Sequence, residues 1–115
     1  QSMREKPQQI HFQKITDAMR IALWKRDTKQ LRAEMGLNSK ANLRDHVTET
    51  GLIYEMLAEN VSEVNLRRHE NLGYAQAEQI VRADSELIGK HAKAVGEHLG
   101  IDIPTGRPLL PAKTK

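Results

Sequence analysis

Hydrophobic side chains recur at spacings of three and four residues along most of this chain. Three such runs extend over residues 10–23, 52–66 and 77–99. This spacing gathers apolar side chains on one face of an α-helix, and no segment has the clear period of two that is typical of a half-buried strand. The pattern therefore predicts an all-α fold.

Capping residues and helix breakers indicate where the first helices begin and end. We expect one helix from Pro7, which suits a first helical turn, to about Trp24 or Arg26. A second long helix should open near Thr48 or Thr50, which precede its apolar run. The stripe that this helix is expected to bury comprises Leu52, Ile53, Met56, Leu57, Val61, Val64 and Leu66.

Acidic side chains in the same helix also follow a regular spacing. Glu55, Glu59 and Glu63 lie four residues apart, so we expect them to line one exposed face. Arg67 and Arg68 follow at the C-terminal end. Negative charge early in a helix and positive charge late in it complement the helix dipole. A structural explanation of the acidic stretch is therefore preferred to a catalytic cluster.

The last third of the chain is expected to be helical up to Gly100. Residues 71–73 should interrupt the helices, and beyond them Asp84 or Ser85 either caps a further helix or lies within one that starts near Tyr74. In the last helix, the positions expected to face the protein core are Leu87, Ile88, His91, Ala92, Val95 and Leu99.

Prolines mark the end of the helical part of the chain. Three of them lie between residues 101 and 111, which excludes a helix there and predicts an extended tail. We therefore expect a small helical bundle of four to five helices in residues 4–100 and an extended, proline-containing C-terminal tail in residues 101–115. Residues 1–3, Gln-Ser-Met, are interpreted as the remnant of a purification tag.

A glycine turn divides residues 27–47 into two expected short helices. Leu31 and Met35 lie four apart, and Gly36 can adopt the left-handed conformation that ends a helix. Asn38 and Ser39 then suit the cap of a second helix. DNA-binding helix-turn-helix units have this outline, and so do ordinary helical corners. Polar residues at inner positions of the second half favour the corner.

Charge is distributed unevenly along the chain. Residues 1–44 carry a net charge of +6, residues 45–66 carry −5 and residues 67–115 carry +2. The basic front could attract phosphates, form a solvated helix surface, or meet the acidic middle of the same chain or of a second copy. Our candidate residues for binding nucleic acid or a partner are Lys25, Arg26, Lys29, Arg32, Lys40 and Arg44.

Candidate catalytic and metal-binding residues are scarce. The chain has no cysteine, which excludes disulfides and thiolate metal sites and suits the cytoplasm. His91 and His98 lie two turns apart on a helix, about 10 Å, which is too far for two ligands of one ion. No apolar run approaches the ~20 residues that span a bilayer. We expect no catalytic residues, metal or cofactor, and neither enzymatic activity nor a membrane span.

Short motifs in two parts of the chain match a known family. The matching residues are Met35-Gly36, Ala41-Asn42-Leu43, Thr48-Glu49-Thr50, Ile88-Gly89-Lys90, Leu99-Gly100 and the tail from Pro104 to Pro111. On these motifs, residues 28–50 and 83–111 resemble the C-terminal region of DinD-like, DNA-damage-inducible proteins, which are related to BRO-type phage antirepressors.

The resemblance implies a regulatory role without catalytic residues. It places the chain in the SOS response or in prophage control, after an N-terminal DNA-binding-like domain. Its expected partners are DNA or a DNA-bound protein, such as a recombinase filament or a repressor. The alternative hypothesis is a homo-oligomerisation module, in which the apolar stripes and the tail build a homodimer.

Overall fold

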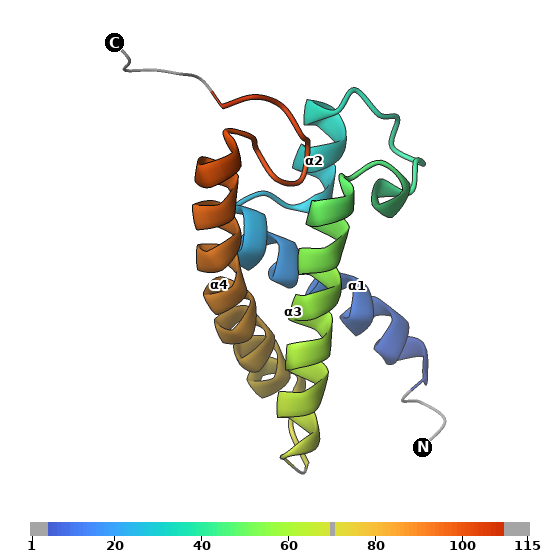
Figure 1. Ribbon diagram of the computed structural model, residues 1–115. Coiled ribbons are helices and arrows are strands. Elements are labelled where there is room, and N and C mark those ends of the chain that lie inside the picture. The colour runs from blue at the N-terminus through green and yellow to red at the C-terminus, as the bar shows by residue number, and fades with distance from the viewer. Residues whose placement is uncertain (1–4, 70, 110–115) are drawn as a thin grey trace.

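The computed structural model describes the backbone of residues 5–69 and 71–109, and the side chains of this part from residue 15 onward. Four α-helices occur in it, which confirms the all-α prediction (Figure 1). They are α1 (Glu5–Trp24), α2 (Thr28–Glu34), α3 (Glu49–Arg67) and α4 (Tyr74–Leu99), with one 3₁₀ turn, η2 (Leu43–Asp45). Residues 1–4 and 110–115, which include the interpreted tag remnant and the end of the expected tail, lie outside the described residues.

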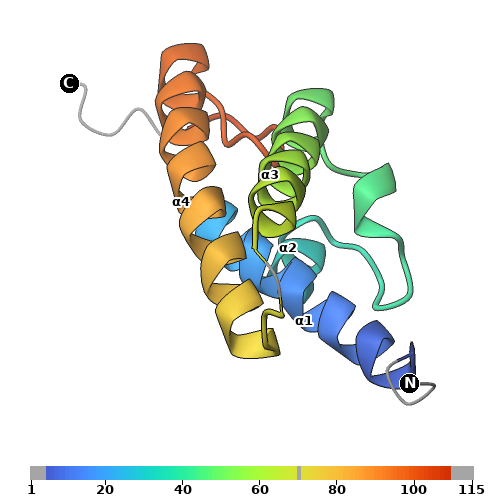
Figure 2. The ribbon, with the colours of Figure 1, turned by 90° about the horizontal axis from the view of Figure 1, so that it is seen from below.

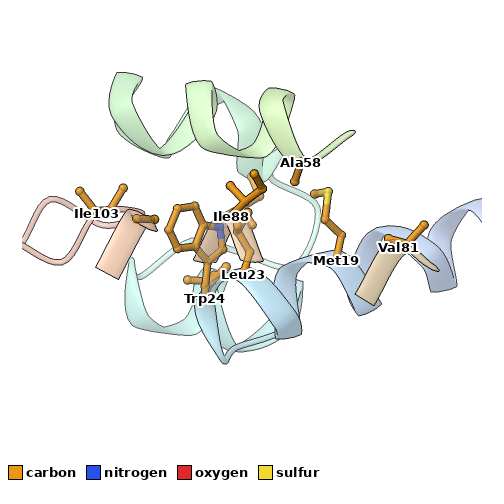
Figure 3. Packing of buried hydrophobic residues seen from close by; sticks show 10 residues of the cluster. Met19, Leu23, Trp24, Ala58, Val81, Ile88 and Ile103 are labelled. Carbon is orange, nitrogen blue, oxygen red and sulfur yellow. The ribbon is translucent and has the colours of Figure 1, made fainter. Parts of the chain in front are cut away.

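The long helices form two layers. Helices α3 and α4 lie side by side and antiparallel, and α1 crosses one face of this pair (Figures 1 and 2). Residues 71–73 form the expected break, and α4 is one continuous helix across Asp84 and Ser85. The core between the layers includes Met19, Leu23, Trp24, Ala58, Val81, Ile88, Ala92 and Ile103 (Figure 3).

Helix α2 forms as its capping residues predict. The Asp27 side chain accepts a hydrogen bond from the Gln30 backbone N–H, and the Gln30 side chain accepts one from the Asp27 backbone N–H. Met35 caps the C-terminal end, and Gly36 follows with a φ of 71°. Because only glycine adopts this left-handed conformation at little cost, the helix stops here.

The second helix expected after Gly36 is not present. The chain instead runs through a loop whose one regular element is η2. Asn38 accepts a hydrogen bond from the Lys40 backbone N–H, and Asn42 accepts one from the Arg44 backbone N–H. Such local bonds from asparagine side chains compete with helix formation. The segment is therefore a corner that anchors buried Leu43, not a helix-turn-helix unit.

The apolar stripe expected to be buried on α3 was wrong in large part. Ile53, Met56 and Val64 are each more than half exposed, and Leu57 is 42% exposed. The buried positions of α3 are Gly51, Glu55, Ala58 and Ser62. Small side chains let this helix approach its neighbours closely, so its large apolar residues are left on the outside.

The core positions expected on α4 were correct in part. Ile88 and Ala92 are buried, whereas Leu87, His91 and Leu99 are exposed. The other buried positions are Val81, Ser85, Gly89 and Gly96. A Cβ atom on Gly89 would lie 2.8 Å from the carbonyl oxygen of Leu23. This glycine therefore permits the close crossing of α1 and α4.

Residues 101–109 clamp the ends of three helices. Ile101 and Pro108 form an isolated β-bridge, which closes a turn in the non-helical segment that the prolines predicted. The Thr48 hydroxyl donates a 2.6 Å hydrogen bond to the carbonyl oxygen of Ile103 and accepts one from the Gly51 N–H. The cap of α3 and the C-terminal loop are thus held by one side chain.

Candidate functional site

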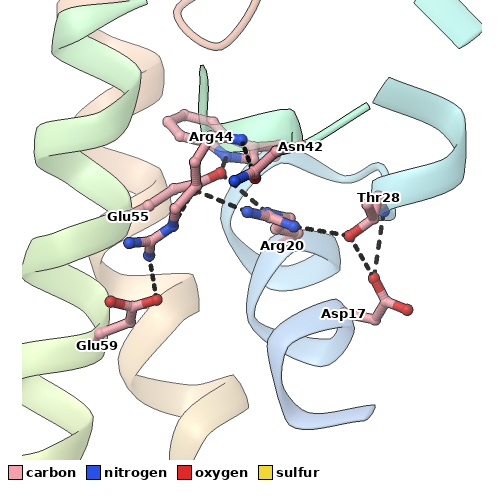
Figure 4. Close-up of polar contacts among 8 residues, drawn as sticks. Asp17, Arg20, Thr28, Asn42, Arg44, Glu55 and Glu59 are labelled. Atoms are coloured by element: carbon pink, nitrogen blue, oxygen red, sulfur yellow. Dashed lines mark hydrogen bonds and ion pairs between the residues drawn. The ribbon is translucent and has the colours of Figure 1, made fainter. Parts of the chain in front are cut away.

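A buried ion pair joins α1 to α3. Arg20 donates two hydrogen bonds of 3.1 Å to the carboxylate of Glu55, and the Trp24 indole N–H donates a third, also of 3.1 Å. Glu55 is fully buried, which contradicts its expected place on an exposed acidic face (Figure 4). Its carboxylate can lie there because three hydrogen bonds, two of them from the cationic Arg20, replace the lost water.

Further polar contacts extend this ion pair toward the surface. Arg20 also donates to the Thr28 hydroxyl at 2.8 Å, and that hydroxyl donates to Asp17 at 2.6 Å. On the other side, Arg44 pairs with Glu59 and lies 3.8 Å from Glu55. The network ties α1, α2, η2 and α3 together (Figure 4). The network therefore stabilises the arrangement of these four elements.

The three arginines of the predicted binding site are engaged in intramolecular contacts. Arg26 pairs with Glu34 at 2.6 Å and with Asp102 at 2.8 Å. Arg32 donates a 2.9 Å hydrogen bond to the carbonyl oxygen of Ala41, and Arg44 belongs to the buried network. These contacts occupy part of the hydrogen-bonding capacity of each guanidinium group.

The three lysines of the predicted site are exposed, and no ion pair is formed by them in the described part of the chain. Lys25 follows the end of α1, Lys29 lies on α2 and Lys40 lies in the loop after α2. Lys25 and Arg26 line a cavity that Lys29, Lys40 and the two other arginines do not reach. Two of the six predicted residues therefore border the cavity, and the other four lie outside it.

The cavity lies between the end of α1, one side of α4 and the C-terminal loop, and has a volume of about 450 Å³. Its walls are mainly apolar and include Ala92, Gly96, Ile101 and Leu109. Charged residues from three segments also line it: Lys25, Arg26, Glu86, Lys90, Lys93, Glu97 and Asp102. Our sequence analysis missed Lys90 and Lys93, because the prolines gave no indication that the tail folds back against α4.

One ion pair at this cavity shifts the pKa of both partners. Partial burial alone would raise the pKa of Asp102, but hydrogen bonds from Arg26 and Thr105 outweigh it and hold the pKa below its ordinary value. For Arg26, burial alone would lower the pKa. The carboxylates of Asp102 and Glu34 outweigh this effect and raise the pKa above its ordinary value. Arg26 and Asp102 therefore stay charged and fasten the loop to the end of α1.

A second surface feature is the outer face of the α3–α4 pair, on the side away from α1. Ile53, Leu57 and Val64 lie roughly 160–200° around α3 from Glu55, which contacts α1. Leu87 lies about 200° around α4 from Gly89, which also contacts α1. All four are exposed. We call Ile53, Leu57, Val64 and Leu87, with Asn60 between the α3 residues, the outer face.

Comparison with known proteins does not assign the chain to a family. No family model, no curated protein and no solved structure matches it. The resemblance to DinD-like and BRO-type proteins therefore stays a prediction from the sequence.

Two further findings concern metals and membranes. Within the side chains that the structure describes, no group of three or more histidine, aspartate or glutamate residues is arranged to hold a metal ion. Over the same part of the chain, none of the helices combines the length and apolar content needed to cross a bilayer.

Proposed function

We propose that this chain is a non-catalytic homo-oligomerisation module of a regulatory protein, in which two copies pair through the outer face. The observation that carries the proposal is the exposure of Ile53, Leu57 and Val64 on α3 and of Leu87 on α4, on the side of both helices away from α1. Exposed apolar side chains that gather on one face mark interaction surfaces more often than scattered ones do. Two antiparallel helix pairs packed face to face would complete a four-helix bundle.

The chemistry of the outer face favours a second copy over an anionic partner. The positions of α3 opposite Glu55 between Thr50 and Arg68 are Ile53, Leu57, Asn60 and Val64, none of them charged. A polyanion such as DNA needs cations, which this face lacks. A neutral apolar face is complementary to itself, as a two-fold interface requires.

Asn60 supplies a further reason to expect self-pairing. It is exposed and lies between Leu57 and Val64 along the outer face. A carboxamide both donates and accepts hydrogen bonds, so two Asn60 side chains can satisfy each other across a two-fold axis. Single asparagines at such positions set register and oligomeric state in helical assemblies.

The oligomeric state of the protein in solution tests this proposal. Light scattering at about 100 µM should give twice the monomer mass of 13.1 kDa. Leu57→Glu combined with Val64→Glu should give a folded monomer, because both side chains are already 42% and 51% exposed. Leu99→Glu is the matched control, since Leu99 is 53% exposed but lies at the end of α4 outside the outer face. A monomeric wild-type protein would rule out self-association.

A second candidate function is the binding of DNA or of a DNA-bound protein, in the cytoplasmic setting of damage response or prophage control. Its support is the exposure of Lys25, Lys29 and Lys40 in the most basic part of the chain. Lys29→Glu with Lys40→Glu should weaken binding to a fluorescent duplex and flatten its salt dependence. Arg32 and Arg44 are unsuitable for this test, because replacing them also breaks intramolecular contacts. If the lysine variant and the wild-type protein bound the duplex with equal affinity, this function would be ruled out.

A further inference from the structure

The backbone of Lys25 is strained where α1 ends. Its φ is 64°, in the left-handed region that residues with a Cβ rarely adopt because the Cβ crowds the backbone there. The same conformation follows α2 at Gly36, with a φ of 71°, and α4 at Gly100, with a φ of 78°. A glycine at position 25 would therefore suit the fold better than the lysine that stands there.

This lysine lines the cavity described above. Lys25 is exposed, and with Lys90 of α4 it borders walls made by Ala92, Gly96 and Ile101. Strained residues at a cavity are often retained for a function that offsets their cost to stability. An apolar interior beside a strained cation suits a ligand with both an apolar part and a negative charge.

The charges around the cavity leave cations available for such a ligand. Arg26 forms ion pairs with Asp102 and Glu34, and Lys93 forms one with Glu97 at 2.6 Å. Lys25 and Lys90 then face one remaining acid, Glu86, for which no ion pair is found in the described part of the chain. Two cations against one anion give a net positive charge.

We propose that this cavity binds a small, soluble amphipathic anion. The apolar body of the ligand lies against Ala92, Gly96, Ile101 and Leu109, and Lys25 and Lys90 hold its carboxylate or equivalent headgroup. A cavity of about 450 Å³ lies within the range of ordinary small-molecule sites. The site is independent of the outer face, so its ligand can bind whatever the oligomeric state.

The single tryptophan allows binding to be measured directly. Trp24 lines the cavity and is the only tryptophan of the chain. The probe is 11-bromoundecanoate below its micellar concentration, because bromine quenches tryptophan fluorescence at short range. We expect saturable quenching by this acid and weaker quenching by 11-bromoundecanol, which has the same chain without the charge.

Substitutions at Lys25 separate binding from folding. Lys25→Gly should weaken binding of the acid about tenfold, since one charged contact is lost. The same change should raise the melting temperature, because it relieves the left-handed strain. Lys25→Arg should retain binding, and Lys29→Gln, which removes an exposed lysine outside the cavity, should leave binding unchanged.

Three results would each overturn the proposal. The first is unchanged binding of 11-bromoundecanoate to the Lys25→Gly variant. The second is equal quenching by the acid and the alcohol, which would show that the charge is not recognised. The third is quenching by brominated phosphatidylglycerol vesicles alone, without any by the free acid, which would assign the cavity to a membrane surface rather than to a soluble ligand.

Discussion

At the scale of single residues, Glu55 connects three elements of the fold through its carboxylate. Its carboxylate receives hydrogen bonds from Arg20 and Trp24 and lies near Arg44, so α1, η2 and α3 meet at one charge. Periodicity assigned this residue to the surface because glutamates spaced by four are usually solvated. Glu55, Glu59 and Glu63 do lie four residues apart on α3. The sequence of α3 alone, however, does not reveal that Arg20 on α1 pairs with Glu55.

Removal of the Glu55 carboxylate should destabilise the protein strongly. Glu55→Ala leaves Arg20 buried without its partner, which costs about 3–5 kcal/mol in comparable ion pairs. Equilibrium unfolding in urea, followed by far-UV circular dichroism, measures the loss. Glu59→Ala, which removes the half-exposed partner of Arg44, should cost less than about 1 kcal/mol. Equal losses for the two variants would show that the buried pair adds nothing.

The charge of Asp102 should make the C-terminal loop sensitive to acid. Its pKa is lowered in the folded protein, so its charge stabilises the fold above its unfolded pKa of about 3.9, and this stability is lost as the pH falls through the folded value. Asp102→Asn should cost about 0.5–1 kcal/mol near pH 6, because the pair is partly exposed.

Unfolding free energies of wild type and Asp102→Asn, measured between pH 6 and pH 2, test this expectation. The gap between them should begin to close below about pH 4, since protonation then removes the charge from the wild-type protein as well. A gap that stays constant to pH 2 would show that the charge on Asp102 does not stabilise the loop.

At the scale of elements, α3 and α4 use the same arrangement to pack. Gly51, Glu55, Ala58 and Ser62 on α3 are spaced by four, three and four residues, and Ser85, Gly89, Ala92 and Gly96 on α4 repeat that spacing. Both helices turn these mostly small residues inward. Apolar residues at helical spacing thus located the helices correctly, but only some of them, such as Ile88 and Ala92 on α4, face the core.

The sequence predicted the ends of the helices better than it predicted their buried faces. Helix ends followed from local chemistry, as at Thr48 and Gly100, because caps and left-handed glycines act within a few residues. The buried faces depended on contacts between distant segments. The cavity depended on the C-terminal loop reaching the end of α1 through Arg26 and Asp102, for which the sequence held no local signal.

Gly89→Ala tests whether close helix approach sets the packing of α4. In an exposed helix this change stabilises by about 1 kcal/mol, because alanine is the better helix former. Here the new Cβ would meet backbone oxygens at 2.8 and 3.0 Å, so a loss of about 1–3 kcal/mol is expected instead. Urea unfolding gives the sign directly. A gain in stability would show that α1 and α4 do not meet as closely as described.

At the scale of the whole molecule, only one of the two faces of the α3–α4 pair is covered by another helix of the described residues. Helix α1 covers one face of the α3–α4 pair (Figures 1 and 2). The large apolar side chains of the opposite face, such as Ile53, Val64 and Leu87, are exposed to solvent. A pair of copies would cover both outer faces at once. Burial of these side chains should then add to the stability of each copy, and this addition depends on protein concentration.

Thermal unfolding at several protein concentrations distinguishes such an assembly from a stable monomer. If two copies pair only when folded, the melting temperature should rise by about 2–4 °C for each tenfold increase in concentration. Leu57→Glu with Val64→Glu should abolish this dependence, while Leu99→Glu should keep it, because only the first pair lies on the outer face. A melting temperature that is independent of concentration in the wild-type protein would leave the outer face without a role in self-association.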